Sequence, residues 1–435
     1  MKKFNYIIFI ILAFFILIVI TGENIFKISI GSSEYGSYVG VFLYIFLILF
    51  SLLILNFLTN YKIVERRLII INRFYHKIVY IFFLFIVYQI LQFVILSNKR
   101  ALLFIPKYIF FILIILLGSA WGLKFVRRNL DTLIKFGLIS CITFILLYSI
   151  HFFLLPFSTG FRINRLSILL GNAVEDGGVF SVFFPFLLFY QHKNNFLKIT
   201  LLTLFIYYMI YYNGTRSSLF AIITSIFIYL LFKKISRRKI ILFFLIFIVS
   251  LLILIPSRKS FVKYDSAFSL HGITAAWNGS YHGNLAIRIG NIWAPMIKHT
   301  INNSPILGFG NGSWATQSRM IGFRSSNSQT YIYNRSPHNA FLVYYVDWGI
   351  FGFLLMIYFF YWGIRTNYRI IGANKYTNLR KYGNIGLCAW INFLLWCLTG
   401  NAHNWAGWLI FAFLNIYTIL LKKEYENTVA VPISD

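Results

Sequence analysis

Long apolar runs alternate with short polar breaks along most of the chain. A helix needs roughly 20 apolar residues to cross the ~30 Å hydrocarbon core of a membrane, because each residue rises about 1.5 Å. Twelve runs approach this length, and they cover residues 5–21, 39–58, 78–97, 102–123, 132–155, 178–191, 198–213, 217–232, 240–255, 338–363, 385–399 and 405–421. The pattern predicts an all-α integral membrane protein with about 12 transmembrane helices.

The connection between the ninth and tenth predicted spans is much longer than the others. It covers residues 256–337 and is rich in Gly, Asn, Ser, His and Arg. A loop of this length inside a compact protein is commonly functional or disordered. Part of it, from Arg288 to His299, is expected to form an amphipathic helix on the membrane. We therefore expect four regions, which are spans 1–9 (1–255), the loop with amphipathic helices (256–337), spans 10–12 (338–421) and a tail (422–435).

Positive charge orients these spans. The formal net charge is +29, from 40 Lys and Arg against 11 Asp and Glu. In a soluble protein this balance would favour nucleic-acid binding. With the N-terminus in the cytoplasm, however, 24 of the 40 basic residues fall in cytoplasmic segments and only six in short loops on the other side. This is the usual bias of membrane proteins, so we expect both termini in the cytoplasm, the long loop outside and no nucleic-acid partner.

The composition is also typical of a membrane protein. Hydrophobic residues make up 59% of the chain and charged residues 12%, against about 25% charged in a typical soluble domain. The N-terminal run lacks a small-residue cleavage site and is expected to be an uncleaved span. The three cysteines lie in apolar segments without metal-ligand spacing and are interpreted as small core residues.

Motifs for nucleotides and metals are absent from the sequence. It contains no phosphate-binding loop of the GxxxxGK[ST] type, no HExxH and no Asp-x-Asp. The pair Glu175–Asp176 is more simply interpreted as solvated loop acids than as metal ligands. We therefore expect no metal and no cofactor, which argues against a metal-dependent enzyme that uses nucleotide sugars.

Three arginines lie on the predicted outer side near the ends of spans. Arg216 stands between two short spans in a Gly-containing turn, Arg165 lies in an outer loop, and Arg288 begins the expected amphipathic helix. A guanidinium group binds phosphate oxygens through a planar fork of donors, so these residues are candidates for a pyrophosphate site. Ordinary contact with lipid head groups is the alternative interpretation and stays open from residue type alone.

His338 begins the tenth predicted span, directly after Pro337. Proline suits the first turn of a helix, and the helix dipole there disfavours protonation of an imidazole. A neutral imidazole suits a general base. The alternative is an interfacial histidine without chemistry, and His403 on the same predicted face is a weaker candidate.

Three motifs in this order resemble the O-antigen ligase and polymerase superfamily of bacterial envelope glycosyltransferases. His338-Asn339, nine residues and then Gly349-Ile-Phe-Gly352 match the pattern His-[Asn/Ser/Gln]-x9-Gly-x-x-Gly. The stretch from Arg288 through Trp293 to Pro305-Ile-Leu-Gly-Phe-Gly310 is similar to Arg-x-x-x-Ile-Trp…Pro-x-x-Gly-x-Gly. The turn 214–217 is similar to Gly-Ser-Arg-Gly but has Ser217 where Gly is usual. The resemblance covers roughly residues 160–400.

The resemblance implies a metal-independent glycosyltransferase of the bacterial inner membrane with a periplasmic active site. Its donor would be a glycan linked to undecaprenyl diphosphate. Carried over to this chain, Arg216 and Arg288, with Arg165 as a further candidate, would bind the pyrophosphate, and His338 would activate the acceptor hydroxyl. Asn339, Gly349 and Gly352 would support the site. The partners implied are the lipid-linked donor, the acceptor and membrane lipids.

The identity of the acceptor separates two closely related functions. An O-antigen ligase transfers the glycan to lipid A–core, whereas a polymerase transfers it to another lipid-linked repeat unit. The His-Asn-x9-Gly-x-x-Gly match favours the ligase. A polysaccharide transporter or flippase is a more distant alternative, which predicts charged residues buried midway in spans. Lys107, Asp131 and Lys135 come nearest to this pattern, but they lie close to predicted span ends.

Overall fold

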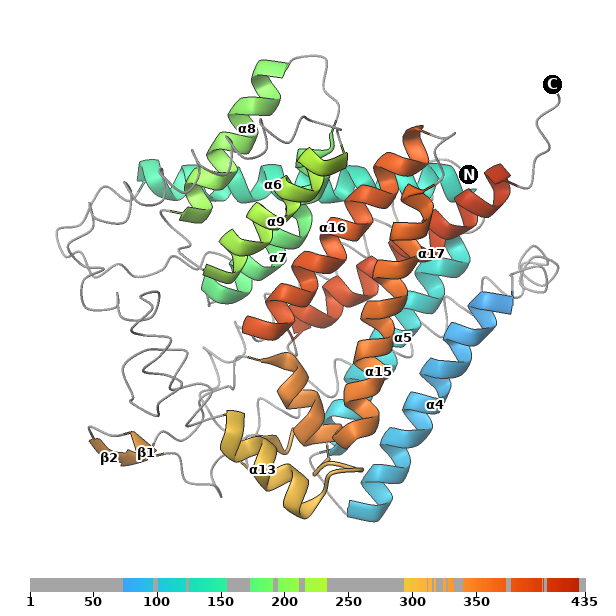
Figure 1. Ribbon diagram of the computed structural model, residues 1–435, viewed down its shortest axis with the longest axis vertical. Coiled ribbons are helices and arrows are strands. Elements are labelled where there is room, and N and C mark those ends of the chain that lie inside the picture. The colour runs from blue at the N-terminus through green and yellow to red at the C-terminus, as the bar shows by residue number, and fades with distance from the viewer. Residues whose placement is uncertain are drawn as a thin grey trace. The chain divides into compact units, whose positions relative to one another are not determined.

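The structure, a computed structural model, is predominantly helical. It describes residues 73–96, 101–122, 125–154, 173–190, 195–210, 216–232, 293–310, 312–314, 317, 324–325, 328–331, 339–372, 377–400, 402 and 405–429. The elements in chain order are α4 (Arg73–Leu96), α5 (Ala101–Gly122), α6 (Val126–Leu154), α7 (Ala173–Leu188), α8 (Asn195–Tyr208), α9 (Arg216–Phe232), α13 (Ala294–Asn303), β1 (Arg324–Ser325), β2 (Ser328–Tyr331), α15 (Ala340–Ile371), α16 (Thr377–Thr399) and α17 (Trp405–Val429) (Figure 1). Within these residues the predicted all-α class is confirmed, apart from one short antiparallel hairpin formed by β1 and β2.

Several of these helices have the length and composition of membrane spans. In the described part of the chain, four are long and apolar enough to cross a membrane, namely Val126–Ile150, Ala340–Ile371, Asn378–Thr399 and Ala406–Val429. Shorter apolar helices cover Phe83–Leu96, Asn195–Tyr208 and Ser217–Leu231. The protein is therefore a multi-pass membrane protein.

Nine of the predicted spans overlap these helices, and those at 5–21, 39–58 and 240–255 lie outside the described residues. Several helix ends differ from the prediction. α6 begins at Val126 rather than at 132, and α15 continues to Ile371 rather than ending at 363. α16 begins at Thr377 rather than at 385, and α17 continues to Val429 rather than ending at 421. The apolar run locates only the part of a helix that lies in hydrocarbon. Arg and Lys are good helix formers, so a helix continues through them beyond that part.

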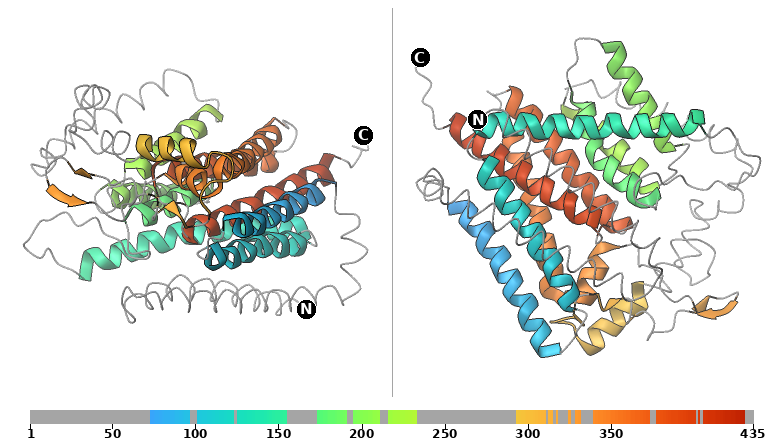
Figure 2. Two further views of the ribbon diagram at one scale, coloured as in Figure 1. Left: turned by 90° about the horizontal axis from the view of Figure 1, so that it is seen from below. Right: turned by 180° about the vertical axis from the view of Figure 1, so that it is seen from behind.

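The chain divides into two compact units, residues 1–225 with 359–435, and residues 226–358. In the first unit, α16 packs against α7 and α17, while α5 packs against α4 and α17. Figure 2 shows α6 running across one side of this bundle, in contact with α7, α8 and α17.

Aromatic side chains fill the core of the first unit. Phe360 stacks on Phe393 with ring centroids 5.3 Å apart, and both rings contact Trp390. Gly363 lets α15 approach α16, because a Cβ atom there would overlap the Trp390 ring. Lipid is as apolar as these side chains, so association in a membrane depends on close packing rather than on apolar burial alone. The abundance of Phe and Trp in the sequence supplies this packing.

Asn392 connects three helices of the first unit through hydrogen bonds. Its Nδ2 donates to the carbonyl oxygen of Ser181 on α7 at 2.6 Å and to Oγ of Ser225 on α9 at 2.9 Å. Asn392 and both serines are buried. A buried amide surrounded by apolar groups is stabilising only while these partners are in place.

Replacing Asn392 by Leu should destabilise the protein by about 1 kcal/mol, since interhelical hydrogen bonds in membranes are of this size. The midpoint of thermal unfolding in detergent measures the effect. Ser225→Ala, which removes one of the two partners, is the matched control and should lower the midpoint less. Equal or higher stability of Asn392→Leu would contradict a bridging role for this side chain.

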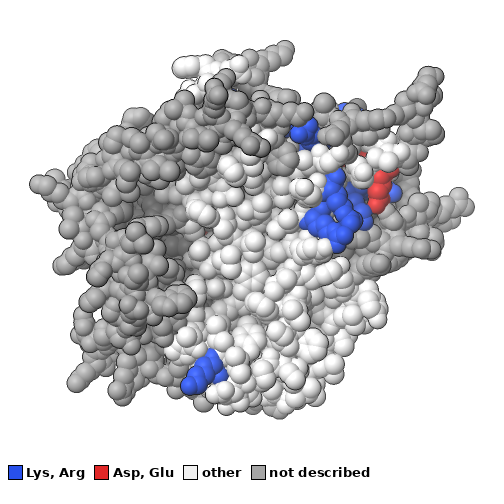
Figure 3. All heavy atoms as spheres, in the orientation of Figure 1, with Lys and Arg blue, Asp and Glu red and all other residues white. Residues whose placement is uncertain are grey.

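The Lys and Arg residues of the last three helices lie toward one end, within the described residues. On the face drawn in Figure 3, the Lys and Arg of the described residues on these helices gather where α15 and α17 end and α16 begins. The surface of these helices below the basic patch is uncharged. Arg365 and Arg369 of α15 and Lys422 and Lys423 of α17 lie at this end. An apolar face that ends in a basic rim is expected where helices leave hydrocarbon for a polar phase.

The structure contradicts the interpretation of Asp176 and confirms that of the cysteines. Asp176 is not a solvated loop acid, because it lies in the first turns of α7 with 0% of its surface exposed. Asp and Glu are favourable near a helix N-terminus, and this accounts for the difference. The interpretation of the cysteines as core residues is confirmed, since Cys141, Cys388 and Cys397 are free and buried.

Candidate functional site

The second unit, described by itself, carries most of the described residues of the two longer motifs. Its α13 is amphipathic. Met296 and Thr300 are buried, whereas Ile297 and Ile301 on the other side are exposed. Met296 packs with Leu342 and Val346 of α15, and the partly buried side chains around them are Trp293, Phe309, Trp314 and Tyr345. This cluster fixes α13 against the first turns of α15.

Asn339 of the His-Asn pair caps α15. Its Oδ1 accepts a hydrogen bond from the backbone N–H of Leu342 at 3.1 Å, and its own carbonyl oxygen accepts from the N–H of Val343. Asn is among the preferred residues at this position, because its side chain satisfies a backbone donor that the helix leaves unpaired. Asn339 thus has a local role at the start of α15, and its predicted support of the site stays a prediction.

The Gly-x-x-Gly motif marks a bend within α15. Gly349 has φ 63° and ψ −159°, a conformation that is essentially restricted to glycine. Gly352 lies one turn later, where a Cβ atom would overlap the side chain of Trp348. Figure 1 shows α15 bending between its short first part and its long second part. The first glycine allows the bend, and the second allows close packing beside it.

The segment Ser304–Gly310 packs directly against this bend. Phe309 N–H donates to the carbonyl oxygen of Val346, and Gly310 N–H donates to that of Asp347, both at 2.9 Å. Ile350 N–H in turn donates to the carbonyl oxygen of Pro305 at 2.9 Å. These three bonds use backbone groups that the bend removes from the regular helical pattern. Two motifs about 40 residues apart in sequence therefore form one structural unit.

The two backbones meet at Gly308 and Gly349. A Cβ atom on Gly308 would overlap the backbone of Asp347 and Gly349, and one on Gly349 would overlap the backbone of Ile306 and Gly308. Gly308 also has a positive φ of 69°. Each position therefore requires glycine both for its conformation and for the approach of the other segment.

Asp347 fixes the next part of the loop. The carboxylate is 4% exposed and accepts hydrogen bonds from Gly312 N–H at 2.9 Å, from Trp314 N–H at 2.9 Å and from Ser313 Oγ at 3.1 Å. Three donors thus converge on one buried carboxyl group and satisfy both of its oxygens. The sequence placed this acid in the tenth span but did not reveal its role. An acid inside an apolar run two residues before Gly349 was the available signal.

Replacing Asp347 by Asn should destabilise the loop, because Nδ2 would then face the N–H of Gly312 and two donors would oppose each other. We expect a loss of about 1–3 kcal/mol in the free energy of unfolding, the usual cost of an unsatisfied buried donor. Ser313→Ala, which removes one hydroxyl donor, should cost less. Thermal unfolding and limited proteolysis within residues 304–317 measure the loss of stability in both variants. Equal losses would contradict the role of the Asp347 carboxyl group in fixing the loop.

His299 of α13 participates in this scaffold. Its ring stacks on Phe309 at a centroid distance of 5.2 Å, and its Nε2 lies 2.7 Å from Oε1 of Gln317. Asn303 donates from Nδ2 to the carbonyl oxygen of His299. His299 therefore has a packing role between α13 and the loop, which spacing in the sequence could not indicate.

The remaining predicted site residues are only partly described. Arg165, Arg288, His338 and His403 lie outside the described residues. Arg216 is the first residue of α9, so its backbone position at a helix N-terminus is described but its side chain is not. No group of three or more His, Cys, Asp or Glu suited to a metal ion occurs among the described residues.

The fold defines a multi-pass α-helical membrane protein. Residues 200–357 match the model of a family described as O-antigen ligase, and this match confirms the resemblance seen in the motifs. Members of this family are membrane glycosyltransferases and ligases, and lipid-linked glycans are their substrates. The matched segment includes Arg216, Arg288, His338, Gly349 and Gly352 but not Arg165. A comparison with curated proteins gives no match.

Proposed function

We propose that the protein is an O-antigen ligase, which transfers a glycan from undecaprenyl diphosphate to lipid A–core on the periplasmic face of the bacterial inner membrane. The observation that carries the proposal is the match of residues 200–357 to the O-antigen ligase family, within which the two longer motifs occur in order. The packing of Ser304–Gly310 against Gly349 supports it, because it gives both motifs a common structural purpose.

In this proposal His338 is the general base. The acceptor hydroxyl oxygen attacks the anomeric carbon of the donor sugar, and its proton passes to the imidazole. The bond from the anomeric carbon to the phosphate oxygen breaks, and undecaprenyl diphosphate leaves with the electron pair. Support comes from the next residue, Asn339, whose side chain caps the start of α15.

Arg216 and Arg288, with Arg165 as a further ligand, bind the pyrophosphate and stabilise its charge as it leaves. Preorganised cations at a developing negative charge are the largest single contribution in many enzymes. Pyrophosphate paired with such cations is a good leaving group, so the reaction requires neither a metal ion nor a nucleotide.

Arg288→Ala should weaken donor binding by about 2 kcal/mol, since hydrogen bonds between charged groups contribute about 1.5–3 kcal/mol. The expected result is a raised KM for the lipid-linked donor with little change for the acceptor. Arg288→Lys keeps the charge but loses the planar fork of donors. Its KM for the donor should lie between those of Arg288→Ala and the wild type. An equal rise of both KM values would argue against a phosphate role.

Deleting the gene and separating surface polysaccharides on a gel distinguishes the two acceptors. A ligase predicts long glycan chains that are not attached to lipid A–core. Attachment of a single repeat unit to lipid A–core would instead indicate a polymerase. An unchanged surface glycan would contradict both.

A further inference from the structure

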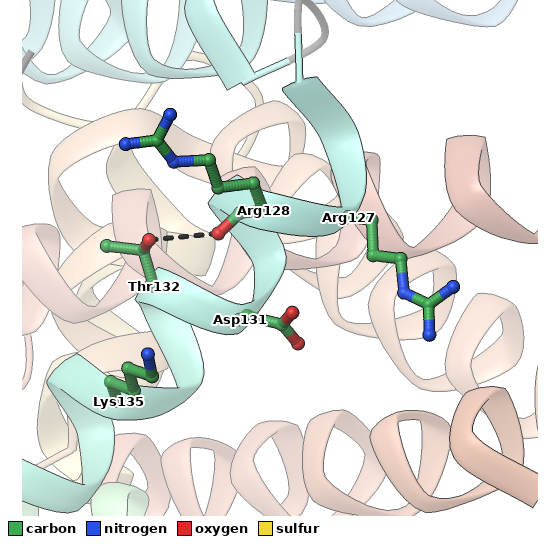
Figure 4. A pocket seen from close by; sticks show the side chains of 5 residues that line it. All are labelled: Arg127, Arg128, Asp131, Thr132 and Lys135. Atoms are coloured by element: carbon green, nitrogen blue, oxygen red, sulfur yellow. Dashed lines mark hydrogen bonds between the residues drawn. The ribbon is translucent and has the colours of Figure 1, made fainter. Parts of the chain in front are cut away.

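A basic hollow lies at the beginning of α6. It has a volume of about 410 Å³ and is lined by Arg127, Arg128, Asp131, Thr132 and Lys135 (Figure 4). Small-molecule sites in proteins commonly have volumes of about 300–1,000 Å³. The hollow carries three cations and one acid, and no ion pair is recorded between them in the described part of the chain. It lies outside the segment that matches the O-antigen ligase family.

The acid in the hollow is engaged by a neighbouring helix. Asp131 Oδ1 accepts a hydrogen bond from the Tyr382 hydroxyl of α16 at 2.8 Å, and the carboxylate also interacts with Lys381. Figure 4 shows Asp131 and Arg127 on one side of α6 and Arg128, Thr132 and Lys135 on the adjoining side. Arg128 and Lys135 are exposed and point away from this acid. Their donors are therefore available to an anion from outside.

The face of α6 that carries Arg128 and Lys135 continues as an apolar stripe. Thr132, Lys135, Ile139, Leu146 and Ile150 follow Arg128 at helical spacing, which places them on one face. Ile139, Leu146 and Ile150 are exposed over 59%, 55% and 52% of their surfaces. From Lys135 to Ile150 the stripe is about 22 Å long, because each helical residue rises about 1.5 Å. A basic end that continues as an apolar face is expected of a membrane helix, and the hollow at this end is the feature that distinguishes α6.

We propose that this face of α6 binds an anionic glycerophospholipid of the membrane. Arg128 and Lys135 hold the phosphate of the head group in the hollow, and an acyl chain lies along Ile139, Leu146 and Ile150. Arginine binds phosphate through a planar fork, and lysine supplies a point charge beside it. Basic pockets at the ends of membrane helices are suited to acidic lipid head groups.

Native mass spectrometry of the full chain in detergent tests the proposal, with phosphatidylglycerol and phosphatidylcholine of matched acyl chains as probes. Each basic residue near an anionic lipid raises the binding affinity by up to about tenfold. The variant Arg128→Gln/Lys135→Gln removes two such residues, and we expect it to bind phosphatidylglycerol roughly tenfold or more weakly than the wild type. Phosphatidylcholine binding should change little. Leu146→Ser, in the apolar stripe, should weaken both lipids.

The matched control is Arg365→Gln/Arg369→Gln. It removes the same charge from the exposed end of α15, where the Arg365 guanidinium already contacts the Tyr361 hydroxyl. We expect less than about a twofold change in phosphatidylglycerol binding, because general surface attraction is screened by salt. Because Arg128 and Lys135 are exposed and form no ion pair with an acid of the described residues, their replacement should leave the midpoint of thermal unfolding unchanged.

Three results would overturn the proposal. The first is an equal loss of binding in the α6 variant and in the control. The second is binding of glycerophosphate or inorganic phosphate as tight as that of phosphatidylglycerol, which would indicate a site for a free anion. The third is tighter retention of undecaprenyl phosphate than of phosphatidylglycerol, which would indicate a donor lipid. None of these outcomes depends on transfer activity, so the proposed ligase function is tested separately.

Discussion

We expect the transfer of glycan to be lost when His338 is replaced by Ala, while the protein remains in the membrane at its normal level. This is the largest effect that we expect from a single substitution. A positioned general base contributes about 10²–10⁴-fold to a reaction rate, so the variant should retain at most about 1% of wild-type activity. The measurement is the rate of transfer from a lipid-linked glycan to lipid A–core in membranes that contain equal amounts of each protein.

The stability of this variant should equal that of the wild type. The side chain that caps the start of α15 is that of Asn339, which this substitution leaves in place. His403→Ala is the matched control, because it removes a second histidine on the same predicted face. It should retain most of the transfer activity. Wild-type transfer by His338→Ala, or equal loss in both variants, would contradict the assignment of the base.

Gly349→Ala should have the largest effect on stability. The conformation of this residue costs a non-glycine residue about 1–3 kcal/mol in backbone strain alone. In addition, the new Cβ atom would overlap the carbonyl group of Ile306, so the loop would have to move away from α15. We expect a loss of about 3 kcal/mol or more, of the size seen when a special backbone conformation is disrupted. Thermal unfolding in detergent measures the loss.

Two further glycines serve as comparisons. Gly308→Ala should destabilise the protein as much as Gly349→Ala, because its Cβ atom would overlap the backbone of Asp347 and Gly349 from the opposite side. Gly372→Ala should be mild, because the nearest atom to its Cβ, the carbonyl oxygen of Arg369, lies 3.3 Å away. A Gly349→Ala protein as stable as Gly372→Ala would refute the tight junction between the loop and the bend. Unlike His338→Ala, Gly349→Ala should lose stability and transfer activity together.

The sequence predicted the helices better than their ends. Apolar runs identify what lies in hydrocarbon, so they located α15 but missed its last turns, which contain Arg365 and Arg369. The same reasoning placed Arg127 and Arg128 outside α6, although both lie in its first turn. The hairpin of β1 and β2 was not predicted, because strands of two and four residues are too short to show a period.

Contacts between distant segments account for most of what the sequence could not show. Gly349 and Gly352 were expected to support the site from motif resemblance, but the reason, a bend that receives the Pro305–Gly310 segment, requires the fold. Asp347 is similar, because its three partners lie 33–35 residues earlier in the chain. Asp176 was misinterpreted since local polarity suggested a loop, whereas packing of α7 against α16 and α6 buries it.

Reconstituted transfer tests the central proposal most directly. The purified chain in lipid vesicles would be given an undecaprenyl-diphosphate-linked glycan and lipid A–core, with EDTA present and no nucleotide added. The account predicts that the glycan becomes attached to lipid A–core, that undecaprenyl diphosphate is released in equal amount, and that His338→Ala protein forms no conjugate above background. Absence of transfer until a divalent metal or a nucleotide is added, or full transfer by His338→Ala protein, would contradict it.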